Sequence, residues 1–157
     1  MKKLTLVAVS LAALAVSGTV WAGGHGGNPA VKARKAHMQL YAFNLGVLGG
    51  MAKGEVEYDA DRATAAANNL VGLTQNVSQA GYWAPGTSNA DLGDETRALP
   101  GLWGADSTAM AIGGEMGEAV VQLAAAAGSG QEGLGAAVGA VGKTCGTCHK
   151  AYRAPSN

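Results

Sequence analysis

Five consecutive residues near the carboxyl end carry the clearest chemistry in this 157-residue chain. Cys145-Gly146-Thr147-Cys148-His149 is the C-x-x-C-H pattern of covalent c-type haem attachment. Residues three apart on a helix lie on the same side of it, so both thiols can form thioethers to the two vinyl groups of one porphyrin. The adjacent His149 imidazole can then reach the iron. The motif therefore predicts one covalently bound haem c.

Two other interpretations of the motif are less consistent with its surroundings. A redox disulfide of the thioredoxin type belongs at a junction between a strand and a helix, whereas this motif lies inside a late helical segment. A zinc site needs about four ligands, and beyond the motif only His25 and His37 are available as further histidine or cysteine donors.

The position of the motif limits which part of the chain can place a group on the second face of the iron. Only eight residues follow His149, so a group on the distal side must come from upstream. The first helix is the natural source, because the first and last helices are neighbours in an up-down bundle.

Composition excludes several classes of protein. Hydrophobic residues make up 48% and charged residues 14%, with 11 basic against 11 acidic side chains. There is no basic surplus to neutralise phosphates, so the composition disfavours a dedicated nucleic-acid binder. Two cysteines cannot make a disulfide framework. No acid/base pair, activated nucleophile or phosphate-binding loop is apparent, so an enzyme is the least favoured class.

The amino-terminal segment has the pattern of a secretory signal peptide. Met1-Lys2-Lys3 is positively charged, residues 4–16 are almost uninterruptedly apolar, and Val20-Trp21-Ala22 ends in a small residue at the expected cleavage position. A retained membrane anchor is the alternative, but spanning a bilayer takes about 20 apolar residues. We expect cleavage after Ala22, a mature domain of residues 23–157, no later membrane span, and a location in a bacterial periplasm.

Four amphipathic segments predict an all-α fold, namely an antiparallel up-down four-helix bundle with covalently bound haem c. Asn28-Pro29 begins the first segment and Asp59 caps the second. Pro100 opens the third, and Gly128-Ser129-Gly130 stops it. The predicted helices cover residues 29–53, 59–80, 100–127 and 134–154. Residues 81–99 are rich in Gly, Ser, Asn and Asp, which predicts a long connection.

Nine glycines interrupt three of these helices, and each costs about 1 kcal/mol relative to alanine. Either the sequence tolerates weak helices, or small residues leave room for a bulky cofactor in the core. The glycines are Gly46, Gly49, Gly50, Gly113, Gly114, Gly117, Gly135, Gly139 and Gly142.

Arg34 is the only charge on the predicted inner face of the first helix, where an unpaired guanidinium would be expensive. A haem propionate would give it a bidentate partner. Alternatively, the side chain reaches water at the end of the bundle. The residues of this face are Val31, Arg34, Met38, Tyr41, Leu45, Leu48 and Ala52.

Together these segments resemble cytochrome c′, the class II c-type cytochromes, over essentially the whole mature chain. The resemblance is carried by Arg34-Lys35-Ala36-His37-Met38, Trp83-Ala84-Pro85-Gly86-Thr87, Pro100-Gly101-Leu102-Trp103 and the residues from Cys145 to Arg153.

The resemblance implies a role for particular residues. His149 would be the proximal iron ligand, Cys145 and Cys148 would hold the haem, and Arg153 would lie beside the proximal face. Arg34 would lie near the haem edge. Trp83 and Trp103 match positions that line the haem pocket, although two large rings would also suit an ordinary core.

Met38 falls at the distal position of the family. In typical members an apolar residue there blocks the sixth site without binding, which leaves five-coordinate iron that accepts NO or CO. In low-spin relatives a methionine there binds the iron. Both outcomes stay open for Met38, which can also simply fill space. His37 lies roughly 100° around the helix from Met38, so the two cannot both face the iron of a regular helix.

Two functions remain. The first is electron transfer with periplasmic redox proteins, with NO or CO binding if Met38 does not ligate; the alternative is a dedicated NO-binding module. Lys143, Lys150 and Arg153 form either a surface that steers an acidic partner or an ordinary solvated face. The resemblance also implies a homodimer through the first two helices, and Leu40, Phe43 and Val47 offer a second apolar face there.

Overall fold

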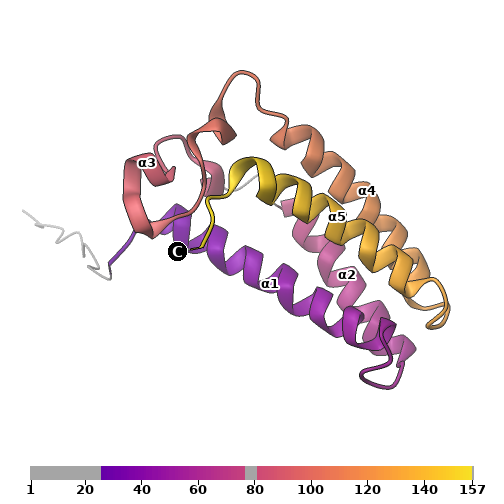
Figure 1. Cartoon of the computed structure of the whole chain (residues 1–157). Coiled ribbons are helices and arrows are strands. Elements are labelled where there is room, and N and C mark those ends of the chain that lie inside the picture. Colours follow the sequence, from indigo (N-terminus) through magenta and orange to yellow (C-terminus); the bar gives the residue numbers. More distant parts are fainter. Residues whose placement is uncertain (1–25, 77–80, 157) are drawn as a thin grey trace, which may run out of the picture.

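The computed structural model describes residues 26–76 and 81–156, and it is an all-α four-helix bundle (Figure 1). The long helices are α1 (Pro29–Ala52), α2 (Ala60–Asn76), α4 (Ala109–Ala127) and α5 (Leu134–Tyr152). The part of the chain that is described contains no strand, only an isolated antiparallel bridge between Ala98 and Arg153. The predicted signal peptide lies outside the described residues, as do Val77 and Ala80 at the end of the predicted second helix.

The helix starts follow local chemistry. The Asn28 side chain accepts hydrogen bonds from the backbone N–H groups of Ala30 and Val31 at 2.9 and 3.3 Å, and Pro29 occupies the first helical position. The carboxylate of Asp59 accepts from the backbone N–H of Arg62 at 3.0 Å. The predicted beginnings of α1 and α2 are therefore confirmed.

The predicted start of the third long helix is wrong. Pro100 opens only a short 3-10 turn, η3 (Pro100–Trp103), and α4 begins at Ala109. Gly104 has extended dihedral angles, φ −70° and ψ 156°, which end the turn. The backbone N–H of Thr108 then donates to the Tyr152 hydroxyl at 2.7 Å, which fixes the entry to α4 against the end of α5.

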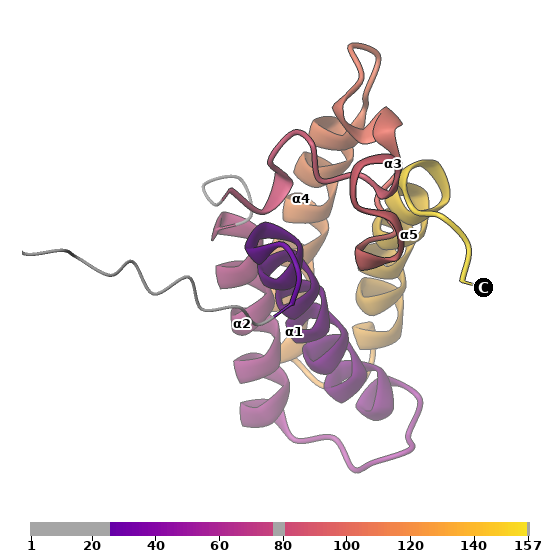
Figure 2. The ribbon, with the colours of Figure 1, turned by 90° about the vertical axis from the view of Figure 1, so that its left-hand side faces the viewer.

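The long connection contains η1 (Gly81–Trp83), α3 (Asn89–Leu92) and η2 (Gly93–Glu95). The Ser88 backbone N–H donates to the Asp91 carboxylate, which forms a capping box at the start of α3. Figures 1 and 2 show this connection gathered at one end of the bundle, by the start of α1 and the end of α5. The backbone N–H of Asn28 donates to the carboxylate of Glu95 at 2.7 Å, which ties α1 to η2.

The fully buried aliphatic core occupies the opposite half of the bundle. Its members come from the end of α1, the middle of α2, the end of α4 and the first half of α5: Leu48, Met51, Leu70, Val120, Leu123, Leu134 and Val141. Toward the connection, buried positions of α1 hold Arg34, His37 and Tyr41 instead. The polar half of the bundle is also the half that holds the C-x-x-C-H motif.

The inner face of α1 is rotated from the predicted one. His37 and Asn44 are buried, whereas Met38 and Leu45 are half-buried. The rotation follows from α2, because the Asn69 amide donates to the Asn44 side-chain oxygen at 3.1 Å. Met38 and Leu45 therefore lie on the edge of α1 away from Asn44.

Most glycines of the long helices lie on outer faces. Gly113, Gly114, Gly135, Gly139 and Gly142 are exposed, and a Cβ at each would meet no atom within 4 Å. They do not line the packed protein interior, and both interpretations of these glycines stay predictions. None of the helices in the described part of the chain is both long and apolar enough to cross a membrane.

Candidate haem-binding site

The two cysteines lie on the second half of α5. Both are free thiols and half-buried, and Cys145 packs against the hydrophobic core. Burial raises the pKa of each thiol, and the charge of Cys145 adds to the rise in the pKa of Cys148. Both thiols are therefore neutral at neutral pH.

His149 occupies the last turn of α5. His149 is exposed, and partial desolvation of its ring lowers its pKa, which the positive charges of Arg153 and Arg97 lower further. A neutral imidazole keeps a lone pair available for a metal ion. Among the described residues, no group of three or more His, Cys, Asp or Glu side chains is placed to hold an ion.

The end of α5 is clamped by the segment just before η3. The backbone N–H of Leu99 donates to the Tyr152 carbonyl at 2.9 Å, and the N–H of Ala154 donates to the Arg97 carbonyl at 2.8 Å. The Arg97 Nε donates to the Ala154 carbonyl, also at 2.8 Å. Arg153, which ends α5, forms the bridge with Ala98 and donates its N–H to the His149 carbonyl. This pairing fixes the residues that follow His149.

Arg34 is 5% exposed, and oxygen atoms of the long connection surround it. Its guanidinium donates to the Tyr82 carbonyl at 2.9 Å, to the Thr87 hydroxyl and carbonyl at 3.1 Å each, and to the Thr96 hydroxyl at 2.8 Å. Burial lowers the pKa of Arg34, yet these four bonds satisfy the charge. The chain itself thus provides oxygen partners for the guanidinium. Contact between Arg34 and a haem propionate stays a prediction.

Trp83 and Trp103 complete the surroundings of Arg34. The guanidinium carbon lies 5.0 Å from the centre of the Trp83 ring and 5.9 Å from that of Trp103. The Trp103 indole N–H donates to the Trp83 carbonyl at 2.7 Å. The two rings, predicted to line a haem pocket, hold Arg34 and join η1 to η3.

Met38 of α1 and Cys145 of α5 both pack against the buried core cluster that includes Tyr41. Burial, with a smaller contribution from the charge of Cys145, raises the pKa of Tyr41 to about 12. Two thiols and an imidazole on α5, with a thioether on α1, form a donor set that fits haem c.

His37 is separate from this donor set. Its ring is 6% exposed and lies 4.9 Å from the Tyr41 ring and 5.4 Å from the Tyr82 ring, measured between centres. Burial lowers its pKa, and a backbone hydrogen bond with Leu73 of α2 opposes that effect. Its Nε2 has no hydrogen-bond partner among the described residues. His37 therefore packs toward α2 and η1.

Sequence reasoning missed the roles of four residues in this region. Tyr41 is a neighbour of Cys145, Arg97 is a neighbour of His149, and Thr87 and Thr96 are partners of Arg34. The Pro-Gly-Thr turn was a signal for Thr87, because a buried arginine needs oxygen acceptors. No comparable pattern marks Arg97.

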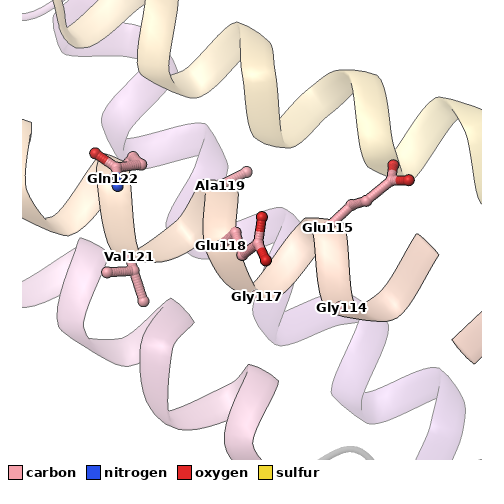
Figure 3. Close-up of a pocket in the computed structure, with 7 residues that line it drawn as sticks. All are labelled: Gly114, Glu115, Gly117, Glu118, Ala119, Val121 and Gln122. Carbon is pink, nitrogen blue, oxygen red and sulfur yellow. The ribbon is translucent and has the colours of Figure 1, made fainter. Parts of the chain in front are cut away.

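A surface hollow lies over α4, and none of the motif residues lines it (Figure 3). One helix supplies every lining residue, so the hollow does not bring together groups from different elements. The lining residues are Gly114, Glu115, Gly117, Glu118, Ala119, Val121 and Gln122.

Comparison with known proteins agrees with this geometry. Residues 29–153 match the family model of cytochrome c′. The chain is 45% identical over 123 residues to a cytochrome c′ of Cereibacter sphaeroides, covering 78% of this chain and 81% of the relative. A solved Rhodobacter cytochrome c′ is 43% identical with a TM-score of 0.76, covering 81% of this chain and 96% of the other. The nitric oxide complex of a variant cytochrome c′ from Alcaligenes xylosoxidans is 30% identical with a TM-score of 0.69, covering 80% and 94%.

A helical bundle with a C-x-x-C-H motif on its last helix defines a c-type cytochrome of the four-helix class. More particularly, the chain belongs to the cytochrome c′ family, whose members are haem c proteins. The predicted family and fold class are confirmed.

Proposed function

We propose that this chain is a periplasmic electron carrier with one haem c, attached through Cys145 and Cys148 and bound at the iron by His149. The observation that carries the proposal is the placement of the motif on α5, with a neutral imidazole beside two half-buried thiols and with Met38 and Tyr41 in the same cluster. When bound, haem c supplies one-electron chemistry through its iron.

The chain's own residues divide the remaining tasks. The clamp of 97–99 on the end of α5 holds the turn that bears His149. Arg34, with Trp83 and Trp103, holds the connection against α1 at the same end of the bundle. Met38, which is half-buried and packs against the core cluster, would cover the distal side of the bound haem by packing rather than by ligation. With this assignment the haem iron would keep a site at which NO or CO could bind.

Absorption spectra of the reduced protein, with and without CO, test the assignment of Met38. We expect a high-spin spectrum that changes at once when CO is added. A low-spin spectrum that ignores CO would contradict it. CO binding that is gained in Met38→Leu but not in Met110→Leu would then identify Met38 as the ligand. Met110→Leu is the control because Met110 is 80% exposed on α4.

The mass of the exported protein tests attachment and processing together. We expect the mass of residues 23–157 plus one haem, which is retained after acid–acetone extraction because thioethers are covalent. A mass equal to the bare polypeptide, or haem lost on extraction, would overturn the proposed cofactor. A mass that includes residues 1–22 would overturn the signal peptide.

The proposed redox partner carries an acidic surface. Lys143, Lys150, Arg153 and Arg97 lie at the haem-binding end, and α5 contains no acidic residue. Among the described residues, the ion pair present is Lys53–Glu55, and none of these four cations takes part in one. We expect electron transfer with an acidic donor to slow steeply with salt. Lys150→Glu should weaken this dependence, whereas Arg62→Glu on α2 should not.

Dedicated NO binding is the second candidate function, favoured by the nitric oxide complex of the Alcaligenes relative. Tight NO binding together with slow electron exchange with every periplasmic donor would favour this alternative. Rapid exchange with an acidic donor at low salt would favour the carrier.

A further inference from the structure

Tyr152 is bonded to two places in the segment that leads through η3 into α4 (Figure 1). Its backbone carbonyl accepts from the N–H of Leu99 at 2.9 Å, and its hydroxyl accepts from the backbone N–H of Thr108 at 2.7 Å. The side-chain hydroxyl of Thr108 lies 3.0 Å from the same phenolic oxygen. One residue of α5 therefore holds both ends of residues 99–108, a segment that we call the strap.

Tyr152 belongs to the same helical turn as the proposed iron ligand. It is the last residue of α5 and follows His149 by one turn. Residues three apart on a helix lie on the same side of it. The residue that holds the strap is thus part of the turn that bears His149.

The strap also reaches the side of α1. Trp103, inside the strap, donates its indole N–H to the Trp83 carbonyl at 2.7 Å. The centre of its ring lies 5.9 Å from the guanidinium carbon of buried Arg34, which precedes Met38 by one turn of α1. The strap therefore connects the turn that bears His149 with the part of α1 that leads to Met38.

A second tyrosine makes comparable bonds at the other end of α4. The Tyr58 hydroxyl donates to the Ala127 carbonyl at 2.7 Å and accepts from the backbone N–H of Gly130 at 3.0 Å. Tyr58 and Tyr152 are both half-buried. Tyr58 is a matched control, because its bonds fix the end of α4 that lies away from the strap.

We infer that Tyr152 is a positioning residue of the haem site: by holding both ends of the strap, it fixes the last turn of α5, and with it His149, relative to Trp103. The inference rests on the proposed haem attachment. Without the phenolic hydroxyl, the backbone N–H of Thr108 loses its acceptor and the strap is held at one end only. The last turn of α5 is then free to shift against the strap.

Amide hydrogen exchange in the haem-loaded protein tests the strap. We expect Tyr152→Phe to accelerate exchange at Thr108, which loses its acceptor, and at Leu99, which keeps its acceptor but belongs to the same strap. Each rate should rise at least about threefold, the factor expected for one ordinary hydrogen bond. Tyr58→Phe should accelerate exchange at Gly130 and leave Leu99 unchanged. Unchanged exchange at Leu99 in Tyr152→Phe would overturn the inference.

Hyperfine-shifted proton resonances of the ferric, haem-loaded protein test the effect on the haem site. We expect the resonances of the haem methyl groups and of His149 to move by more than their linewidths in Tyr152→Phe and to stay in place in Tyr58→Phe. Equal thermal destabilisation of the two variants with unchanged resonances would overturn the inference, as would the same shifts in Tyr58→Phe. If Tyr152→Phe does not accumulate, Thr108→Pro removes the same hydrogen bond from the donor side.

Failure of the proposed function has a different signature. Absence of a Soret band in the wild-type protein would overturn the haem attachment and, with it, the effect on the haem site. The exchange rates at Leu99 and Thr108 depend on the strap alone, so they separate that outcome from a strap that does not hold the turn.

Discussion

Arg34 places a full positive charge inside the bundle. Hydrogen bonds to three parts of the connection, at Tyr82, Thr87 and Thr96, offset the desolvation of that charge. Removing the guanidinium would leave those buried oxygen atoms without a donor. We expect Arg34→Met to lower the free energy of unfolding by about 2–4 kcal/mol, measured by urea denaturation. Arg62→Met, at an exposed position, serves as the control and should change it by less than about 0.5 kcal/mol. A loss under 1 kcal/mol for Arg34→Met would mean that the four bonds contribute little.

Tyr41 gives the fold a sensitivity to alkali. Its pKa is raised from 10.0 to about 12, so above pH 10 the unfolded chain releases a proton that the native state retains. The unfolded state then binds fewer protons than the native one, so stability falls as pH rises from about 10 toward 12. By pH 11 the loss should be about 1 kcal/mol.

Urea denaturation at pH 8 and pH 11 checks this prediction. The Tyr41 phenol is neutral in both the native and the unfolded state at pH 8, and comparison of wild type with Tyr41→Phe isolates its ionisation at pH 11. Tyr41→Phe should lose about 1 kcal/mol less than wild type over this interval. An identical loss in the two proteins would show that the phenol ionises as readily in the native state as in the unfolded chain.

At the level of the helices, α5 offers a matched pair of glycines. A Cβ at Gly139 or at Gly133 would meet no atom within 4 Å, but Gly133 has φ +82° at the helix start whereas Gly139 is inside the helix. Gly139→Ala should therefore stabilise the protein by about 0.5–1 kcal/mol. Gly133→Ala should destabilise it by about 1–2 kcal/mol, because alanine disfavours left-handed dihedral angles. Melting temperatures that move in the same direction for both variants would contradict this explanation.

Helices were predictable where one local signal defines each end. Asn28-Pro29 and Asp59 mark true starts, and Gly128 marks a true stop. The prediction at Pro100 was wrong because a proline favours the first position of a 3-10 turn as well as that of an α-helix. The start of α4 is instead fixed by the hydrogen bond from Thr108 to Tyr152, which lies 44 residues away in the sequence. Such a long-range contact leaves no periodic pattern in the sequence.

At the scale of the whole molecule, α1 carries an apolar surface that the bundle does not use. Phe43 is 67% exposed and Leu40 is 51% exposed, while the third residue of the predicted dimer face, Val47, is half-buried. An exposed cluster of large apolar side chains suits a symmetric contact between two copies. A homodimer through α1 and α2 therefore remains our prediction.

Sedimentation velocity at fixed protein concentration checks the dimer. We expect wild type to sediment as a dimer and Phe43→Asp as a monomer. Val121→Asp, at a 55% exposed position on α4, should remain dimeric. A monomeric wild type would rule out the dimer, and a monomeric Val121→Asp would move the contact to α4.

The residues expected to attach the haem could be named from sequence because all five are adjacent and their spacing places both thiols on one side of a helix, and the attachment itself stays a prediction. The surroundings could not be identified in the same way. Arg34 was expected to need a partner, but Thr96 lies 62 residues away, so its role depends on how the connection folds. Whether His37 or Met38 faces α2 depends on how α1 is rotated about its own axis. Packing against the other helices sets that rotation, and the spacing of the hydrophobic residues does not reveal it.

The contacts of Arg34 span 48 to 62 residues of the chain, whereas α4 and α5 are joined by a short turn. Closing so long a segment costs more chain entropy than closing the short turn, so we expect this cluster to form after α4 and α5 have paired. Changes around Arg34 should consequently accelerate unfolding while the refolding rate stays nearly constant. On this expectation, Arg34 would set how long that end of the bundle stays closed rather than how quickly the chain first collapses.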